Sequence, residues 1–272
     1  MHCIHRQSGS GVGARPQVGC HGTPLARVDP VEAAQLLVQR RVGRVSPCHD
    51  ATMITLHYNP GSASLAVHVL LHESGAPFEL ALVDPGLQAH KAPAYLKLNP
   101  NGLIPVVVDR RAGGELVLYE TAAILLHLAD TWPQAGLCPA LGSAERAHYY
   151  KWMVWLTNTL QAALIPYFYP ERMVADGNTD GAAQVKARAM ARVGLLLEQM
   201  DAQLASHGQP WLLGPSYSAV DPLAWMLTRW TRNFTERPAR DFAHIAAYQQ
   251  RMLARPAVQA AIAAEGLQAP HA

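Results

Sequence analysis

The stretch Asn99-Pro100-Asn101-Gly102-Leu103-Ile104-Pro105 lies where an apolar strand begins, so its last proline decides how that strand is entered. Tyr58-Asn59-Pro60-Gly61-Ser62-Ala63-Ser64 precedes it in the chain, and Tyr119-Glu120-Thr121-Ala122-Ala123-Ile124 follows it. A proline-interrupted segment at a strand start and a polar pair that opens a helix are typical of a site that holds a small peptide by its backbone and its amino-acid end.

The apolar pattern around these stretches predicts one α/β domain over residues 53–132. Strands are predicted at Met53–Tyr58, Phe78–Val83, Pro105–Asp109 and Leu116–Tyr119, and helices at Ser64–Ser74, Pro93–Leu98 and Thr121–Asp130. A Gly-Gly turn joins the last two strands as a hairpin. The order β-α-β-α-β-β-α is that of a thioredoxin-like domain.

Residues 133–142 are rich in Pro and Gly and are predicted to form a linker to an all-helical domain over residues 143–272. Its predicted helices are Ser143–Ala175, Ala182–Ser206, Ala219–Arg232, Asp241–Arg255 and Pro256–Ala264. Ser143 is a helix start signal. Ser218 and Asp221 predict a capping box, in which the hydroxyl and the carboxylate each accept a hydrogen bond from a backbone N–H.

Residues 1–52 form an N-terminal extension that we expect to be disordered or absent from the working protein. Its first part is rich in Gly, Ser, His and Pro and lacks an apolar period, while Val28–Val45 could form one short helix. Its Cys-His neighbours fit no common zinc spacing. The extension is rich in Arg, as transit peptides are, but its Gly and Pro content opposes a long amphipathic helix. Met53 is an alternative start.

Composition excludes some functional classes. Charged residues make up 15% of the 272-residue chain, and the formal net charge is +2, which gives no electrostatic case for nucleic-acid binding. No apolar run is long enough for a membrane-spanning helix. Cys138 is the one cysteine beyond the extension, which suits a reducing cytoplasm and excludes a disulfide framework there.

Two of the motif stretches each allow a structural and a functional interpretation. Pro105 could follow a cis peptide bond that turns the Ile104 N–H and C=O toward a ligand, or be an ordinary trans proline at an edge strand. Glu120 and Thr121 could bind the ammonium and carboxylate of a ligand at a helix start, where backbone N–H groups are unpaired. They could equally be a plain threonine cap beside an exposed acid.

Residues 53–265 resemble a bacterial glutathione transferase of the beta class. Residues 60–66 are similar to the entrance of that class's first helix, and residues 99–105 match the family's N-P-x-G-x-x-P. Glu120-Thr121 stands where the family has Glu-Ser, and Ser218-x-x-Asp221 stands at its helical capping motif. The resemblance implies a thioredoxin-like N-terminal domain, an all-α C-terminal domain, and glutathione as the co-substrate.

The resemblance also implies roles for individual residues. Ile104, after which Pro105 is cis, should bind the cysteinyl backbone of glutathione, and Glu120 with Thr121 its γ-glutamyl end. Lys91 and His90, beside Asn101, are placed to reach the glycyl carboxylate, although Lys91 could be a solvated loop charge.

The chain departs from the beta class at the position of that class's cysteine, which is Ala63 here. A mixed disulfide between protein and glutathione at this position is therefore impossible. A hydroxyl must stabilise the thiolate instead, and the candidates are Ser64, Ser62 and Tyr58. Ser64 is slightly favoured because it lies nearest the helix N-terminus, but its hydroxyl could serve as the helix cap.

The predicted helix from Ser143 carries an aromatic stripe that includes Tyr149 and Trp155. Such a stripe is more often core or dimer interface than substrate site, but Trp155, Asn158 and Gln161 are candidates for the electrophile pocket. The chain is thus expected to be a cytoplasmic, homodimeric glutathione transferase that adds the thiolate to small hydrophobic electrophiles and needs no metal. Two alternatives are a glutathione-dependent disulfide or peroxide reductase that uses no protein Cys, and a non-catalytic binding protein.

Overall fold

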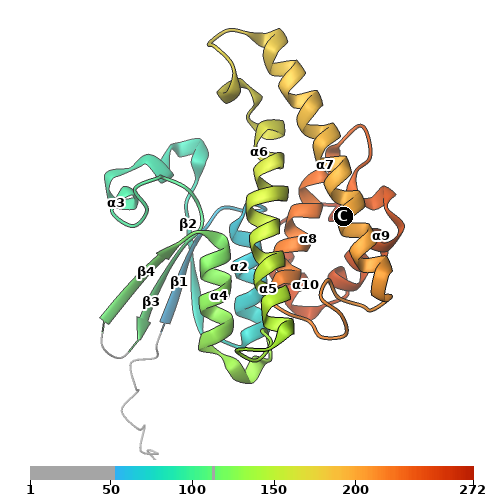
Figure 1. Ribbon diagram of the computed structural model, residues 1–272. Coiled ribbons are helices and arrows are strands. Elements are labelled where there is room, and N and C mark those ends of the chain that lie inside the picture. Colours follow the sequence, from blue (N-terminus) through green and yellow to red (C-terminus); the bar gives the residue numbers. More distant parts are fainter. Residues whose placement is uncertain (1–52, 112–113) are drawn as a thin grey trace, which may run out of the picture. The chain divides into compact units, whose positions relative to one another are not determined.

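The computed structural model describes residues 53–111 and 114–272 (Figure 1). The predictions made for residues 1–52 lie outside the described residues, as does Gly113 of the predicted Gly-Gly turn, whereas Gly114 is the first residue of a strand.

Four strands form one mixed sheet in the order β2-β1-β3-β4. β1 (Met53–Tyr58) runs parallel to β2 (Phe78–Leu82) and antiparallel to β3 (Val106–Arg111), and β3 is antiparallel to β4 (Gly114–Tyr119). The parallel pair needs a crossover, which α2 (Ser64–Ser74) supplies. Each predicted strand is confirmed, with bounds that shift by one or two residues.

Helices cover both faces of the sheet. α2 and α4 (Thr121–Thr131) lie on one face, and the short α3 (Pro93–Leu96) lies on the other. Because successive side chains of a strand point to opposite faces, β3 contributes to both cores. The first face carries Ile54, Leu56 and Val107, and the second carries Val106 and Val108, which pack with Tyr95 of α3.

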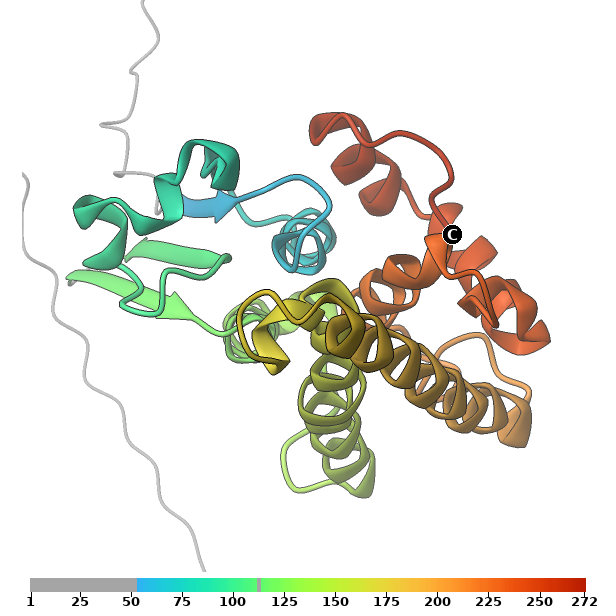
Figure 2. The ribbon, with the colours of Figure 1, turned by 90° about the horizontal axis from the view of Figure 1, so that it is seen from above.

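α2 is the helix that joins the two domains. Its residues from Ser64 to Leu71 are all buried, because it also packs against α8 (Val220–Trp230) and α10 (Pro256–Ala264) of the helical domain. Figure 2 shows it between the sheet and these two helices. A helix enclosed on all sides needs apolar residues all round, which explains why α2 lacks a polar face.

The helical domain begins with Ser143, whose hydroxyl accepts a hydrogen bond from the Arg146 N–H at 3.1 Å, as predicted. Its longer helices are α5 (Ala144–Trp155), α6 (Ala162–Phe168), α7 (Thr179–His207), α8, α9 (Ala243–Leu253) and α10. Several bounds differ from prediction: α7 starts three residues early and ends one late, α8 starts one residue late and ends at Trp230 before a 3₁₀ turn, and α9 is two residues shorter at each end.

The prediction of one helix over Ser143–Ala175 is wrong. A π-helical segment, Leu156–Gln161, separates α5 from α6, and the α-helix ends at Phe168. The hydroxyl of Thr157 donates to the carbonyls of Met153 and Val154, so it competes for the acceptors of an ordinary turn. Pro170 has no N–H and disfavours helical geometry in the residue before it, which accounts for the helix end.

The capping box at the start of α8 is half right. The Asp221 carboxylate accepts from the Ser218 N–H at 2.8 Å as predicted, but the Ser218 hydroxyl donates to the same carboxylate and caps no N–H. Asp221 also accepts from the Leu212 N–H and from the hydroxyl of Tyr248, because three segments converge on it. Complete burial raises the pKa of Asp221 to about 6, against these hydrogen bonds.

Candidate functional site

The three motif stretches meet at one end of the sheet. Val106, the first residue of β3, pairs with His57 on one side and with Tyr119 on the other. The loop that follows β1, the segment that enters β3 and the residues that leave β4 are therefore neighbours. This register brings Ser62, Ile104 and Glu120 to the same edge, although they are far apart in the chain.

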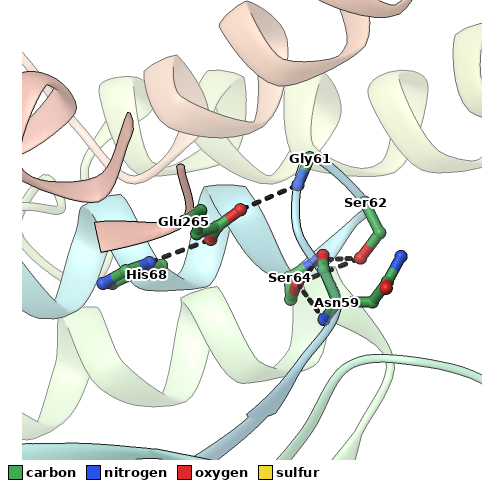
Figure 3. Close-up of polar contacts among 6 residues, drawn as sticks. All are labelled: Asn59, Gly61, Ser62, Ser64, His68 and Glu265. Carbon is green, nitrogen blue, oxygen red and sulfur yellow. Dashed lines mark hydrogen bonds and ion pairs between the residues drawn. The ribbon is translucent and has the colours of Figure 1, made fainter. Parts of the chain in front are cut away.

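The two candidate serines in the loop between β1 and α2 differ in burial and in hydrogen bonding (Figure 3). Ser64 is fully buried, and its hydroxyl donates to the Asn59 carbonyl at 3.0 Å and accepts from the Asn59 N–H at 3.2 Å. The hydroxyl of Ser62 is partly exposed and lies 3.0 Å from that of Ser64. Because Ser64 has already used its proton, Ser62 is the donor that can turn toward a ligand.

Ser64 is not the cap of α2, contrary to the alternative considered for it. It is the first residue of the helix, and Ala63 occupies the cap position without a side-chain hydrogen bond. The third candidate, Tyr58, is half-buried at the end of β1, and its ring tilts toward that of His68 at 6.4 Å.

Two residues of the helical domain fix this loop. The carboxylate of Glu265, directly after α10, accepts from the Gly61 N–H at 2.8 Å and contacts Nδ1 of His68 at 2.9 Å, as Figure 3 shows. On α8, the indole N–H of Trp230 donates to the Gly61 carbonyl at 3.1 Å. Gly61 has a φ of 68°, a conformation that glycine adopts without strain. No local sequence pattern points to Glu265 or Trp230, so sequence analysis missed both.

The Ile104–Pro105 peptide bond is cis, as predicted. The Leu103 carbonyl accepts from the hydroxyl of Tyr95 at 2.8 Å and from the side-chain amide of Asn99 at 2.9 Å. Burial raises the pKa of Tyr95 to about 12, so its hydroxyl stays a donor. The Ile104 N–H and C=O make no hydrogen bond with the described part of the chain, which leaves them available to an extended peptide.

Lys91 and His90 lie against the same segment. The Lys91 ammonium is 3.4 Å from the Asn101 carbonyl, and a Cβ on Gly102 would lie 2.8 Å both from that ammonium and from the His90 carbonyl. Gly102, with a φ of 61°, is therefore required for this close approach. Lys91 is exposed beside Asn101, and its contact with a ligand carboxylate stays a prediction.

Glu120 occupies a backbone conformation that few residues other than glycine adopt, with a φ of 72°. Such a conformation costs on the order of 1–3 kcal/mol and is found mainly at functional sites. Glu120 is exposed, and Thr121 is the first, buried residue of α4. The alternative in which Thr121 is a plain helix cap is contradicted, because Glu120 holds the cap position and no described side chain caps it. The first N–H groups of α4 thus remain without a side-chain acceptor.

The structure separates the aromatic residues of the long helices into core and surface. Tyr149 is fully buried, and Trp155 is half-buried with its ring 4.9 Å from that of Trp152. Asn158 is exposed and Gln161 is half-buried, both on the π-helical segment. Among the described residues, none of these forms a hydrogen bond with the Gly61 loop.

A different pair of aromatic rings lies beside the loop. Phe168 is 40% exposed and stands edge-on to Trp230 at 5.9 Å, and Trp230 is the residue that binds the Gly61 carbonyl. This pair supplies an apolar surface next to Ser62 that sequence analysis did not identify, because it needs the end of α6 to meet the end of α8.

Within residues 53–111 and 114–272, no three His, Cys, Asp or Glu side chains gather to hold a metal ion, and that none is needed stays a prediction. In the same ranges no helix has the length and apolar character to cross a membrane.

Comparisons with known proteins agree with this architecture. Residues 62–131 match the family model of the glutathione S-transferase N-terminal domain, and residues 156–256 match that of the C-terminal domain. Glutathione S-transferase GST-4.5 of Xanthomonas campestris is 34% identical over 78% of this chain and 98% of its own. The disulfide-bond oxidoreductase YfcG of Escherichia coli is 26% identical over 77% and 94%.

A solved structure adds a ligand to the comparison. A sphingomonad glutathione S-transferase in complex with glutathione superposes with a TM-score of 0.66 at 32% identity, over 79% of this chain and all of that one.

Proposed function

Since the chain belongs to the glutathione S-transferase family, we propose that it adds the thiolate of glutathione to small hydrophobic electrophiles. The observation that supports this most directly is the meeting of the three motif stretches at Val106. There the unpaired backbone of Ile104, the uncapped start of α4 and the Ser62 loop lie at the same end of the sheet.

In this proposal, glutathione lies along the segment that enters β3. The Ile104 N–H and C=O pair with its cysteinyl backbone. Glu120 pairs with the γ-glutamyl ammonium, while Thr121 and the first N–H groups of α4 hold the γ-glutamyl carboxylate. Lys91, with His90 and Asn101, holds the glycyl carboxylate.

We further propose that Ser62, and not the slightly favoured Ser64, stabilises the thiolate. A free thiol has a pKa near 8.5, and lowering it by about two units takes roughly 2.7 kcal/mol. A hydrogen bond to a charged acceptor supplies about 1.5–3 kcal/mol, and a helix start adds about 0.3–1 kcal/mol. Ser62 can give its proton while Ser64 keeps its bonds to Asn59. Tyr58 remains the third candidate.

In this proposal the electrophile lies over the Phe168 and Trp230 rings. The pocket predicted from the sequence, with Trp155, Asn158 and Gln161, is the alternative position. We also propose that the protein is a beta-class-like enzyme without that class's cysteine, that it works as a homodimer in the cytoplasm, and that it uses no metal. Sedimentation velocity of the purified chain tests the dimer.

A pH titration of bound glutathione, followed by ultraviolet thiolate absorbance, tests the mechanism. The full chain is compared with Ser62→Ala, Ser64→Ala and Tyr58→Phe. We expect a thiol pKa below that of free glutathione in the wild type, and an increase of about 1–2 units in Ser62→Ala alone, since one hydrogen bond to a charge is lost.

Other results lead to different conclusions. A pKa that rises only in Ser64→Ala or Tyr58→Phe would move the role to that residue. An unshifted pKa with glutathione bound would contradict the mechanism and leave a binding protein. Rapid reduction of a model disulfide with little transfer to an aromatic halide would favour the reductase activity.

A further inference from the structure

Arg229, on the last turn of α8, is a buried guanidinium without an acidic partner. Arg229 is only 2% exposed, and its Nε is buried without a hydrogen-bond partner among the described residues. No carboxylate lies within ion-pair distance of it among the residues that the structure describes. A buried charge without a partner is costly, so its presence calls for a function or for a ligand that supplies the missing acceptor.

Arg229 faces the loop that carries Ser62. A Cβ at Gly61 would lie 3.4 Å from its Nη1, so the guanidinium touches the backbone there. The next residue, Trp230, binds the Gly61 carbonyl and meets Phe168 edge-on. The unpaired donors of Arg229 therefore lie beside the aromatic pair over which the electrophile is proposed to bind.

Two more basic groups gather at this point. Arg232 is one turn further along, and its guanidinium donates to the Arg229 carbonyl at 3.2 Å. His271, near the end of the sequence, has a buried Nδ1 with no partner, and its pKa is lowered by burial and by the charges of Arg229 and Arg232. Burial, with the charge of Arg232, lowers the pKa of Arg229 to about 10, so the guanidinium stays charged at neutral pH.

The nearest acid does not neutralise this cluster. Glu265 is close enough to act on Arg229 electrostatically, but one of its oxygens accepts from the Gly61 N–H and the other contacts His68. The cluster is thus a concentration of positive charge with unused donors, next to the proposed reaction centre. A small anion is the chemical group that would complete it.

We propose that Arg229, with Arg232 and His271, binds an anionic group of the second substrate, so that the preferred electrophiles carry a carboxylate or sulfonate. This inference rests on the proposed transferase function, since it assigns a substrate class to that site. In the test reaction with 4-chloro-3,5-dinitrobenzoate, the thiolate sulfur forms a bond to the ring carbon, and the carbon–chlorine bond breaks to release chloride. The carboxylate stays unreacted on the cluster.

The experiment compares this acid with its neutral methyl ester in the full chain, Arg229→Gln and Arg232→Gln. We expect the wild type to prefer the acid, and Arg229→Gln to lose about tenfold or more in kcat/KM for the acid while the ester changes less than about twofold. Arg232→Gln, at a half-buried position that folding tolerates better, should lose part of the same preference.

Lys151→Gln is the matched control, because it removes the same charge elsewhere. Lys151 lines a cavity of about 410 Å³ together with Ser218, next to the start of α8, whereas Arg229 lies at the other end of that helix. In Lys151→Gln, the ratio of kcat/KM for the acid to that for the ester should equal the wild-type ratio. An acid-to-ester ratio of kcat/KM that is unchanged in both arginine variants would overturn the proposal. An equal fall in kcat/KM for the acid and the ester would also overturn it, and would assign Arg229 to the glutathione thiolate.

A binding measurement separates this inference from the transferase function. Calorimetric titration with 3,5-dinitrobenzoate and with its methyl ester, neither of which carries a leaving group, reports the anion preference without catalysis. Tighter binding of the acid that is lost in Arg229→Gln supports the cluster even if no transfer is detected. Equal binding of acid and ester by the wild type contradicts it even if transfer is fast.

Discussion

At the scale of single residues, Glu265 connects the loop of the site to the helical domain. Its buried carboxylate holds both the Gly61 N–H and the ring of His68. Truncation leaves the buried His68 ring and the half-buried Gly61 N–H without this partner, so we expect Glu265→Ala to lower the free energy of unfolding by about 2–4 kcal/mol. Glu265→Gln keeps an oxygen that can accept from Gly61 and should lose less. Urea unfolding of both variants beside Glu236→Gln, an exposed control, measures the effect. Equal midpoints for Glu265→Ala and the control would contradict it.

At the scale of one element, the start of α8 is held by a carboxylate that titrates in an unusual range. The pKa of Asp221 rises from 3.8 to about 6 on burial, so the folded protein keeps a proton that the unfolded chain has released. The stability that this group contributes is full below pH 3.8 and is lost as the pH rises through 6, by at most about 3 kcal/mol. The difference in unfolding free energy between the wild type and Asp221→Asn should therefore fall from pH 4 to 6 and stay constant above pH 7. A difference that does not change with pH would show that the shift is absent.

At the scale of the whole described chain, α2 belongs to the cores of both domains. Near the C-terminal end of α2, the Glu73 carboxylate accepts two hydrogen bonds from the Arg255 guanidinium, at 2.6 and 2.8 Å. We expect one cooperative unfolding transition. Five of the six tryptophans lie in residues 143–272, so the fluorescence reports mainly on the helical domain, while hydrogen exchange of β1 and β3 amides reports on the sheet. Both should show the same midpoint, and Arg255→Gln should move the two together. Separate midpoints would mean that the domains unfold independently.

The elements that the sequence predicts well are those with local signals. Alternating apolar residues mark β1, and Gly75 marks the end of α2. The cis bond before Pro105 is instead implied by the resemblance of residues 99–105 to a family motif. The features that the sequence does not reveal depend on contacts between distant segments. Glu265 reaches Gly61 across 204 positions, and the role of Ser62 depends on the hydrogen bonds of Ser64, which only the folded loop shows.

The register at Val106 also divides the sheet into two ends of different character. β3 leaves the site at Val106 and pairs at its other end through Arg111 and Gly114, about 17 Å away for five residues of extended chain. Insertions at that hairpin end add chain without displacing Ile104, Glu120 or the Ser62 loop. One end of β3 thus positions the proposed site, and its hairpin end is a position where a fused peptide can be attached. We expect a fusion there to keep the recognition of the substrate.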